Sequence, residues 1–105
     1  MSKHIKRDLK DVDVRTILER LASIPIRTWS YESDPATRHI GPSSEDFYEV
    51  FGFGGDERYI GTIDADGVAL AAIQGLVKEH AELREEVRRL RERLANLQPN
   101  QERGE

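Results

Sequence analysis

Histidine and cysteine are the side chains best suited to hold a metal or attack a substrate, and the chain is poor in both. It has three histidines, His4, His39 and His80, and no cysteine. No two histidines have a metal-ligand spacing such as H-x-x-x-H. Without cysteine, disulfides, thiolate nucleophiles and zinc ribbons are excluded. We therefore expect no metal site and no cofactor.

The glycine-rich segment at 52–55 could be compared with loops that bind phosphate. It lacks the Lys-Ser/Thr pair of such loops, and it does not stand between a strand and a helix. A flexible turn is the expected structure.

The net charge argues against nucleic acid as a partner. The chain has 16 Lys and Arg against 20 Asp and Glu, so its formal charge is 16 − 20 = −4. A nearly neutral chain lacks the positive field that holds a polyanion. The arginines between positions 84 and 93 alternate with glutamates, and in zipper-type DNA readers the basic region precedes the zipper. We interpret these arginines as the solvated faces of a helix.

The length of 105 residues allows one small domain with at most an appendage. No stretch approaches the roughly 18 apolar residues of a membrane span, and the first residues lack the apolar run of a signal peptide. The chain itself therefore predicts no membrane partner.

Residues 1–66 are interpreted as a globular head. Apolar residues at positions 14, 17, 18 and 21 predict an amphipathic helix over 13–23. Alternating apolar and polar residues predict a strand over 26–31, and a short strand is expected over 38–40. The cap spacing that begins at Ser43 predicts a helix that ends by Gly52. A further strand is expected over 58–63.

One long helix is predicted over 67–98, because this stretch has no proline and is rich in Ala, Leu, Glu and Arg. At 1.5 Å per residue it would span about 48 Å, longer than the remaining residues could cover. Residues 99–105 are expected to form a flexible tail.

The long helix carries a heptad repeat. With position a at Ile73, steps of three and four residues define a seam, by which we mean positions a and d at Ile73, Leu76, His80, Leu83, Val87, Leu90, Leu94 and Leu97. The flanking g and e positions match Glu79 with Arg84 and Glu86 with Arg91, as in parallel strands in register. The alternative is an amphipathic helix packed on its own head, but the coiled coil is the stronger interpretation.

The number of strands in the coil stays open on physical grounds. A β-branched residue at a with Leu at d favours two strands, yet this seam also has His80 and Leu94 at a. The segment from Arg93 to Gln98 is close to a pattern that favours three. His80 is interpreted as a polar layer that fixes register, or as a pH sensor whose protonation below about pH 6.5 would loosen the coil.

Three segments in this order resemble the C-terminal intramolecular chaperone domain of phage tail spikes and tail fibres, also found on bacterial surface proteins: IPIRTWSY at 24–31, RHIGP at 38–42 and DADGVALAAIQGL at 64–76. The resemblance covers residues 3 to about 78. Structural candidates within these segments are Trp29, His39, Gly41, Asp66 and Gly67. The fold implied is α+β, with a small head of short strands and helices followed by a long helix in a parallel trimeric coiled coil.

The resemblance also implies a Ser–Lys dyad that cuts the chaperone from its upstream fibrous client, just before the Ser. Carried onto this chain, the family's spacing places the base at Lys6 and the nucleophile at position 1, which is Met1. A Lys can act as the base for a Ser hydroxyl, but the nucleophile is absent. We therefore expect a released or non-cleaving form and no enzyme activity from the chain as given.

The function predicted is trimerisation and folding assistance for a tail-fibre-like or surface fibrous protein. The alternatives are a stand-alone coiled-coil adaptor and a competent Ser–Lys self-cleaving peptidase. The location stays open between a phage tail and the bacterial cytoplasm or surface.

Overall fold

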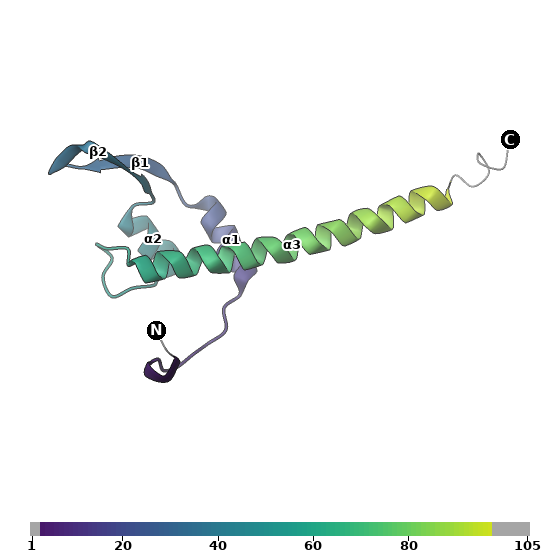
Figure 1. The fold of residues 1–105 in the computed structure, drawn as a ribbon, viewed down its shortest axis with the longest axis horizontal. Helices are drawn as coiled ribbons and strands as arrows, with labels where there is room; N and C mark the ends of the chain where they lie inside the picture. Colours follow the sequence, from purple (N-terminus) through teal and green to yellow (C-terminus); the bar gives the residue numbers. More distant parts are fainter. Residues whose placement is uncertain (1–2, 98–105) are drawn as a thin grey trace. The chain divides into compact units, whose positions relative to one another are not determined.

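The computed structural model describes residues 3–97 and confirms short helices and strands followed by a long C-terminal helix (Figure 1). The elements are η1, a 3₁₀ turn (Lys3–Ile5), α1 (Val14–Ser23), β1 (Arg27–Tyr31), β2 (Asp34–Gly41), α2 (Ser44–Phe51) and α3 (Thr62–Asn96). The chain divides into two compact units, Met1–Gly75 and Leu76–Glu105. Helix α3 contributes residues to both. The tail predicted at 99–105 lies outside the described residues.

Helix α1 begins where the sequence predicts, because Asp13 caps it. The Asp13 Oδ1 atom accepts hydrogen bonds from the backbone N–H groups of Arg15 (3.1 Å) and Thr16 (3.3 Å). These donors have no partner within the helix. The bond from the Thr16 backbone is the main cause that lowers the pKa of Asp13.

Strands β1 and β2 form a two-stranded antiparallel sheet in which Trp29 pairs with His39. The strand predicted at 38–40 is too short, because β2 already begins at Asp34 and includes Pro35. Proline removes a hydrogen-bond donor, but an edge strand tolerates it, and both strands of this sheet are edges. The two strands are joined by a turn at residues 32–33.

Helix α2 confirms the predicted cap and stop. The Ser43 Oγ atom accepts a hydrogen bond from the Asp46 backbone N–H (3.1 Å). Gly52 ends the helix at φ 69°, a left-handed conformation that glycine adopts without a steric penalty. Phe47 and Phe51 lie one turn apart with ring centroids separated by 5.0 Å, and both are buried.

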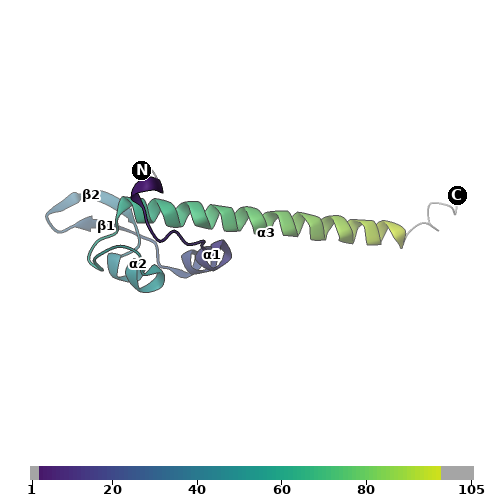
Figure 2. The same cartoon turned by 90° about the horizontal axis from the view of Figure 1, so that it is seen from below.

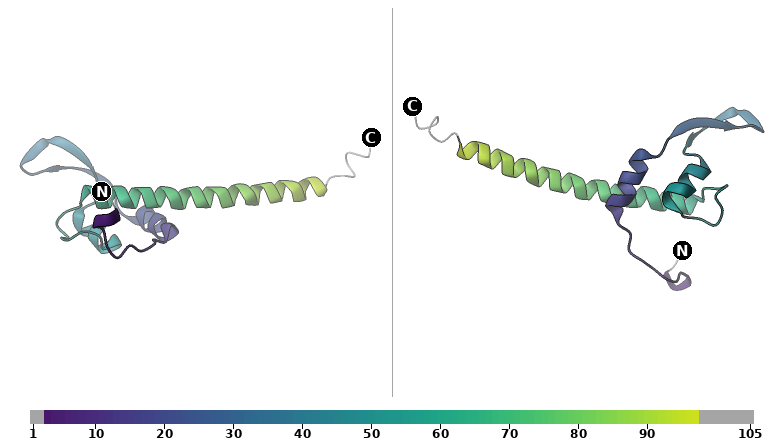
Figure 3. Two further views of the ribbon diagram at one scale, coloured as in Figure 1. Left: turned by 60° about the horizontal axis from the view of Figure 1, so that its bottom comes forward. Right: turned by 180° about the vertical axis from the view of Figure 1, so that it is seen from behind.

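The core of the first unit lies where α1, α2 and the first turns of α3 meet. Its buried side chains are Ile17, Ile24, Phe47, Phe51, Val68 and Ala72. Figures 2 and 3 show α1 and α2 along the same side of these turns of α3. Partly buried Leu18, Leu21, Val50, Ile60 and Ala71 pack around the cluster.

The strand predicted at 58–63 is wrong. In the structure, Asp56 organises a turn by accepting a hydrogen bond from the Arg58 backbone N–H (2.9 Å). Helix α3 then begins at Thr62, where the Ala65 N–H donates to the Gly61 carbonyl (2.9 Å). Ile60 packs against the core of the head. It does not belong to a strand, because the described chain has no third strand that could pair with it.

The start predicted for the long helix at position 67 is also wrong by five residues. Asp64 stands in the first turn of α3, where a negative charge offsets the helix dipole. Asp66 and Gly67, which the resemblance suggested as structural candidates, therefore lie inside the helix. The predicted end at position 98 lies outside the described residues, and α3 ends at Asn96.

Gly75 allows α3 to approach the backbone of α1. A Cβ atom at this position would lie 2.5 Å from the Val14 carbonyl oxygen and 3.2 Å from the Leu18 Cβ. A backbone atom cannot move aside as a flexible side chain can. Gly75 is buried together with Val68 and Ala72, so these three residues define the face of α3 that packs on the head.

We predict opposite effects for two Gly→Ala substitutions in α3. Gly75→Ala should destabilise the fold by roughly 1–3 kcal/mol, because overpacking against the Val14 backbone outweighs the better helix propensity of alanine. Gly67→Ala has open space around its Cβ and should stabilise the fold by about 0.5–1 kcal/mol. Urea unfolding at one protein concentration measures both. Equal effects of the two substitutions would contradict the close approach at Gly75.

Candidate functional site

The seam residues are exposed in the single chain, and all but Leu97, which directly follows the helix, lie on α3. Their apolar members range from 37% exposed at Val87 to 81% at Leu97, and His80 is also exposed. The face that α3 uses to pack on the head is a different one, formed by Val68, Ala72 and Gly75. Packing of the seam on its own head is not seen at Ile73, the seam residue of the first unit, which is 57% exposed. The proposed contact of the seam with other copies stays a prediction.

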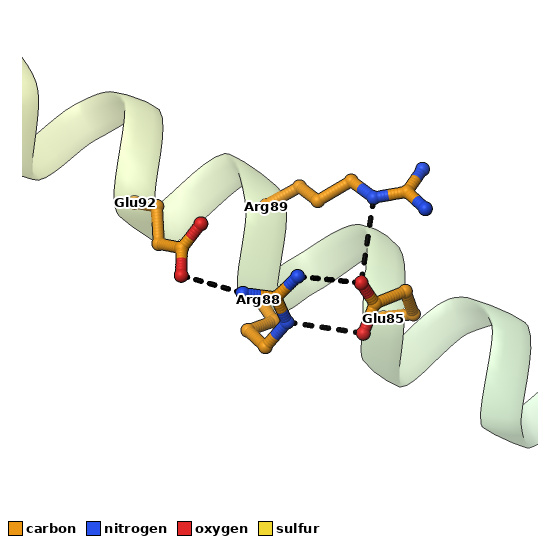
Figure 4. Close-up of polar contacts among 4 residues, drawn as sticks. All are labelled: Glu85, Arg88, Arg89 and Glu92. Atoms are coloured by element: carbon orange, nitrogen blue, oxygen red, sulfur yellow. Dashed lines mark hydrogen bonds and ion pairs between the residues drawn. The ribbon is translucent and has the colours of Figure 1, made fainter.

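The ion pairs within α3 lie on the face away from the seam. Arg88 donates to Glu85 (2.6 Å) and to Glu92 (2.5 Å), and Arg89 lies 3.4 Å from Glu85 (Figure 4). These residues occupy heptad positions b, c and f. Pairs at i,i+3 and i,i+4 support an isolated helix modestly.

The four charged residues predicted to pair between copies take no part in those bonds. Among the side chains that the structure describes, no ion pair within α3 involves Glu79, Arg84, Glu86 or Arg91. The outer face of α3 therefore satisfies its own charges, while the charges that flank the seam stay available for a partner.

On the outer face of α3, Glu85 is in contact with two arginines, Arg88 and Arg89. The hydrogen bond from Arg88 is the main cause that lowers the pKa of Glu85, and the charge of Arg89 adds to it. The same contact raises the pKa of Arg88. Both groups stay ionised across the physiological range.

The hairpin presents an aromatic cluster on one face. The ring of Trp29 lies 4.9 Å from the rings of Tyr31 and His39, and Tyr31 lies 5.3 Å from His39, measured between centroids. Trp29 and His39 pair across the two strands, and the structural roles expected for them stay predictions. The Trp29 Nε1 atom is buried without a hydrogen-bond partner in the described chain, and such donors normally have one.

Arg38 organises the other face of the hairpin, and sequence reasoning missed it. Its guanidinium donates to the Ser30 Oγ (3.2 Å) and the Thr28 Oγ1 (2.9 Å). Residues 28 and 30 share a face because side chains alternate along a strand. The missed signal was this alternation combined with the register that places Arg38 opposite them.

Gly41 ends β2 at φ 153°, a conformation that side chains rarely adopt. The chain turns here from β2 toward the Ser43 cap of α2, and the structural role of Gly41 stays a prediction. Gly67, another structural candidate, lies within α3 with open space around it, and its role stays a prediction.

Lys6 lies in the exposed segment between η1 and α1, and Met1 lies outside the described residues. The position matched to the nucleophile is therefore not part of the described structure. Among residues 3–97, no group of three or more His, Asp or Glu side chains could hold a metal ion. In the same range, no helix is long and apolar enough to cross a bilayer.

A comparison with protein-family models identifies one whose description is chaperone of endosialidase, and it matches residues 2–55. This match spans just over half of the chain. The chain belongs to the chaperone of endosialidase family. No curated protein and no solved structure matches it.

Membership establishes this molecule as a chaperone-type domain and confirms the resemblance of the first two sequence segments. The match covers the segment around Lys6, α1, the hairpin and α2. It does not reach α3, so the seam of this endosialidase chaperone domain is known from its sequence and structure alone.

The pH dependence of α3 in this chaperone domain follows from Glu85. A lowered pKa means that Glu85 stabilises the fold above its ordinary value of 4.5 and loses this effect as the pH falls below it. Glu85→Gln should lower the melting temperature at pH 7 and lower it less at about pH 3, where part of the carboxylate is protonated. Glu49→Gln on α2 serves as the control. An equal loss at both pH values would contradict the role of the Glu85–Arg88 pair.

Proposed function

We propose that three copies of this chain associate in parallel through the seam of α3 and thereby assist the folding of a fibrous client joined upstream. The client is a tail-fibre-like or surface fibrous protein. The observation that carries the proposal is the exposure of seven apolar seam residues on a helix whose head-packing face lies elsewhere.

Burial of the seam gives the driving force. A leucine side chain that moves from water into a packed interface contributes about 1.5–3 kcal/mol. Seven apolar layers therefore outweigh the entropy lost when chains associate, which a single exposed helix cannot achieve. Association also stabilises the small head, because a unit of this size buries too little surface to be very stable alone.

The charges that flank the seam favour parallel chains in register. In that arrangement Glu79 of one copy faces Arg84 of the next, and Glu86 faces Arg91. None of these four is used by the ion pairs within the described part of α3. Antiparallel helices would not bring these oppositely charged residues together.

Three strands are proposed because the family resemblance implies a trimer. The seam itself mixes β-branched and other residues at position a, so it favours neither two nor three strands decisively. His80 would then form one polar layer on the axis, which fixes the register at a cost in stability.

A parallel trimer places the three heads at the same end and holds three upstream chains in step. Fibrous β-structures depend on non-local pairing between chains, which forms slowly and exposes strand edges. The hairpin is suited to contact such a client or a neighbouring head. Nearly all of β2 is exposed, a two-stranded sheet is marginal alone, and the Trp29 Nε1 donor lacks a partner.

The proposal is not enzymatic. In the sequence the position matched to the family's nucleophile holds Met1, and Lys6 is exposed.

We predict that charge within the seam abolishes association. Leu83→Glu combined with Leu90→Glu buries six carboxylates in a trimer and should give a monomer by light scattering, where the natural chain gives the mass of three copies. Ala95→Glu lies at position b on the same helix and should leave the trimer intact. A natural chain with the mass of one copy would contradict the proposal.

The chaperone role is tested separately from association. The chain is fused downstream of a fibre that aggregates alone, with and without the double substitution. We expect soluble trimeric fibre only with the natural seam. An intact trimer that leaves the fibre yield unchanged would instead support the coiled-coil adaptor.

A further inference from the structure

A second apolar stripe runs along the first half of α3. Ile63, Leu70 and Val77 are 71%, 65% and 61% exposed. They are seven residues apart and occupy successive e positions of the heptad. Farther along, the e positions are Arg84 and Arg91. The e flank of the helix therefore changes from apolar to charged just beyond Gly75, the last buried residue of α3.

The opposite flank of these turns is occupied by the chain's own head. Val68 and Gly75 are at position c and Ala72 is at position g, and all three are buried. In a parallel coiled coil the g flank of one helix meets the e flank of its neighbour. The apolar stripe of one copy must then face the head of the adjacent copy, and not its own.

A segment of the head that also carries apolar residues begins next to Gly75, on the flank of α3 that packs on the head. Val14 lies against Gly75, and the chain before it, residues 3–12, is exposed throughout its described side chains. We name it the leader. It carries Ile5, Leu9 and Val12, which are 71%, 68% and 51% exposed. Within residues 3–97, the rest of the chain leaves them uncovered.

The distances between the apolar residues of the leader match those between the apolar residues of the stripe. Leu9 and Val12 are three residues apart and span up to about 10 Å when extended. One heptad of helix rises about 10.5 Å, the separation along the axis of Leu70 and Val77. From Val12 to Ile5 the leader reaches about 23 Å, and the whole stripe is about 21 Å long.

The two surfaces also have opposite charge. Residues 3–12 contain four basic and two acidic side chains, so their charge is 4 − 2 = +2. Residues 62–75 contain Asp64 and Asp66 and no basic residue, so their charge is −2. Attraction between them favours the leader over any acidic segment as the occupant.

We propose that the leader of one copy packs on the α3 stripe of the adjacent copy, with Leu9 against Leu70. This inference rests on the proposed parallel trimer. Each leader then joins two subunits, so the segment nearest to the client is held between copies before the client folds. Lys6 is carried to the same boundary between subunits.

Disulfide trapping tests this contact cleanly, because the natural chain has no cysteine. Leu9→Cys and Leu70→Cys are made in separate full-length chains, which are refolded together and oxidised. We expect a covalent dimer of the two variants. The matched control pairs Leu9→Cys with Lys78→Cys, at position f on the outer face of α3, and should give at least tenfold less dimer.

A single chain with both substitutions separates docking between copies from docking within one copy. Contact between copies gives linked oligomers, whereas a chain closed on itself would overturn the proposal. Equal trapping of the Leu70 and Lys78 pairs would also overturn it. Light scattering of the reduced variants distinguishes this failure from that of the parent proposal: a trimer without trapping sinks the leader contact alone, and a monomer sinks both.

Discussion

The close approach of the α1 backbone to α3 at Gly75 determines what each face of the long helix is free to do. The Val14 carbonyl occupies the space that a side chain would need, and Val68 and Ala72 extend the same contact toward the start of the helix. In these turns the head packs on positions c and g, with Ala71 at position f beside them. The seam at positions a and d stays exposed, and with it the apolar stripe at position e.

The sequence predicts the helices well, because caps and stops are local. Asp13, Ser43 and Gly52 act through their immediate neighbours, so α1 and α2 end where expected. The hairpin and the start of α3 were predicted less well. Strand length depends on pairing, and pairing with β1 extends β2 back to include Pro35. Among the described residues no third strand is available to pair with residues 58–61, so these residues form a turn.

The candidate site likewise combines features that the sequence predicts with features that depend on tertiary contacts. The seam follows from a period that the sequence alone reveals. Which flank of α3 carries the head depends on the tertiary contact at Gly75, which no periodicity indicates. For this reason the stripe at Ile63, Leu70 and Val77 could not be recognised as separate from the packing face. The aromatic cluster on the hairpin likewise required the register that pairs Trp29 with His39.

The direction and number of the α3 helices are the centre of this account, and distances between spin labels measure both. A single label at Ala95→Cys should give one distance below about 30 Å, since packed helices lie about 8–10 Å apart, with a modulation depth for three spins. Distances only beyond about 30 Å would indicate antiparallel helices. No dipolar modulation would show a lone chain, and either result would contradict the account.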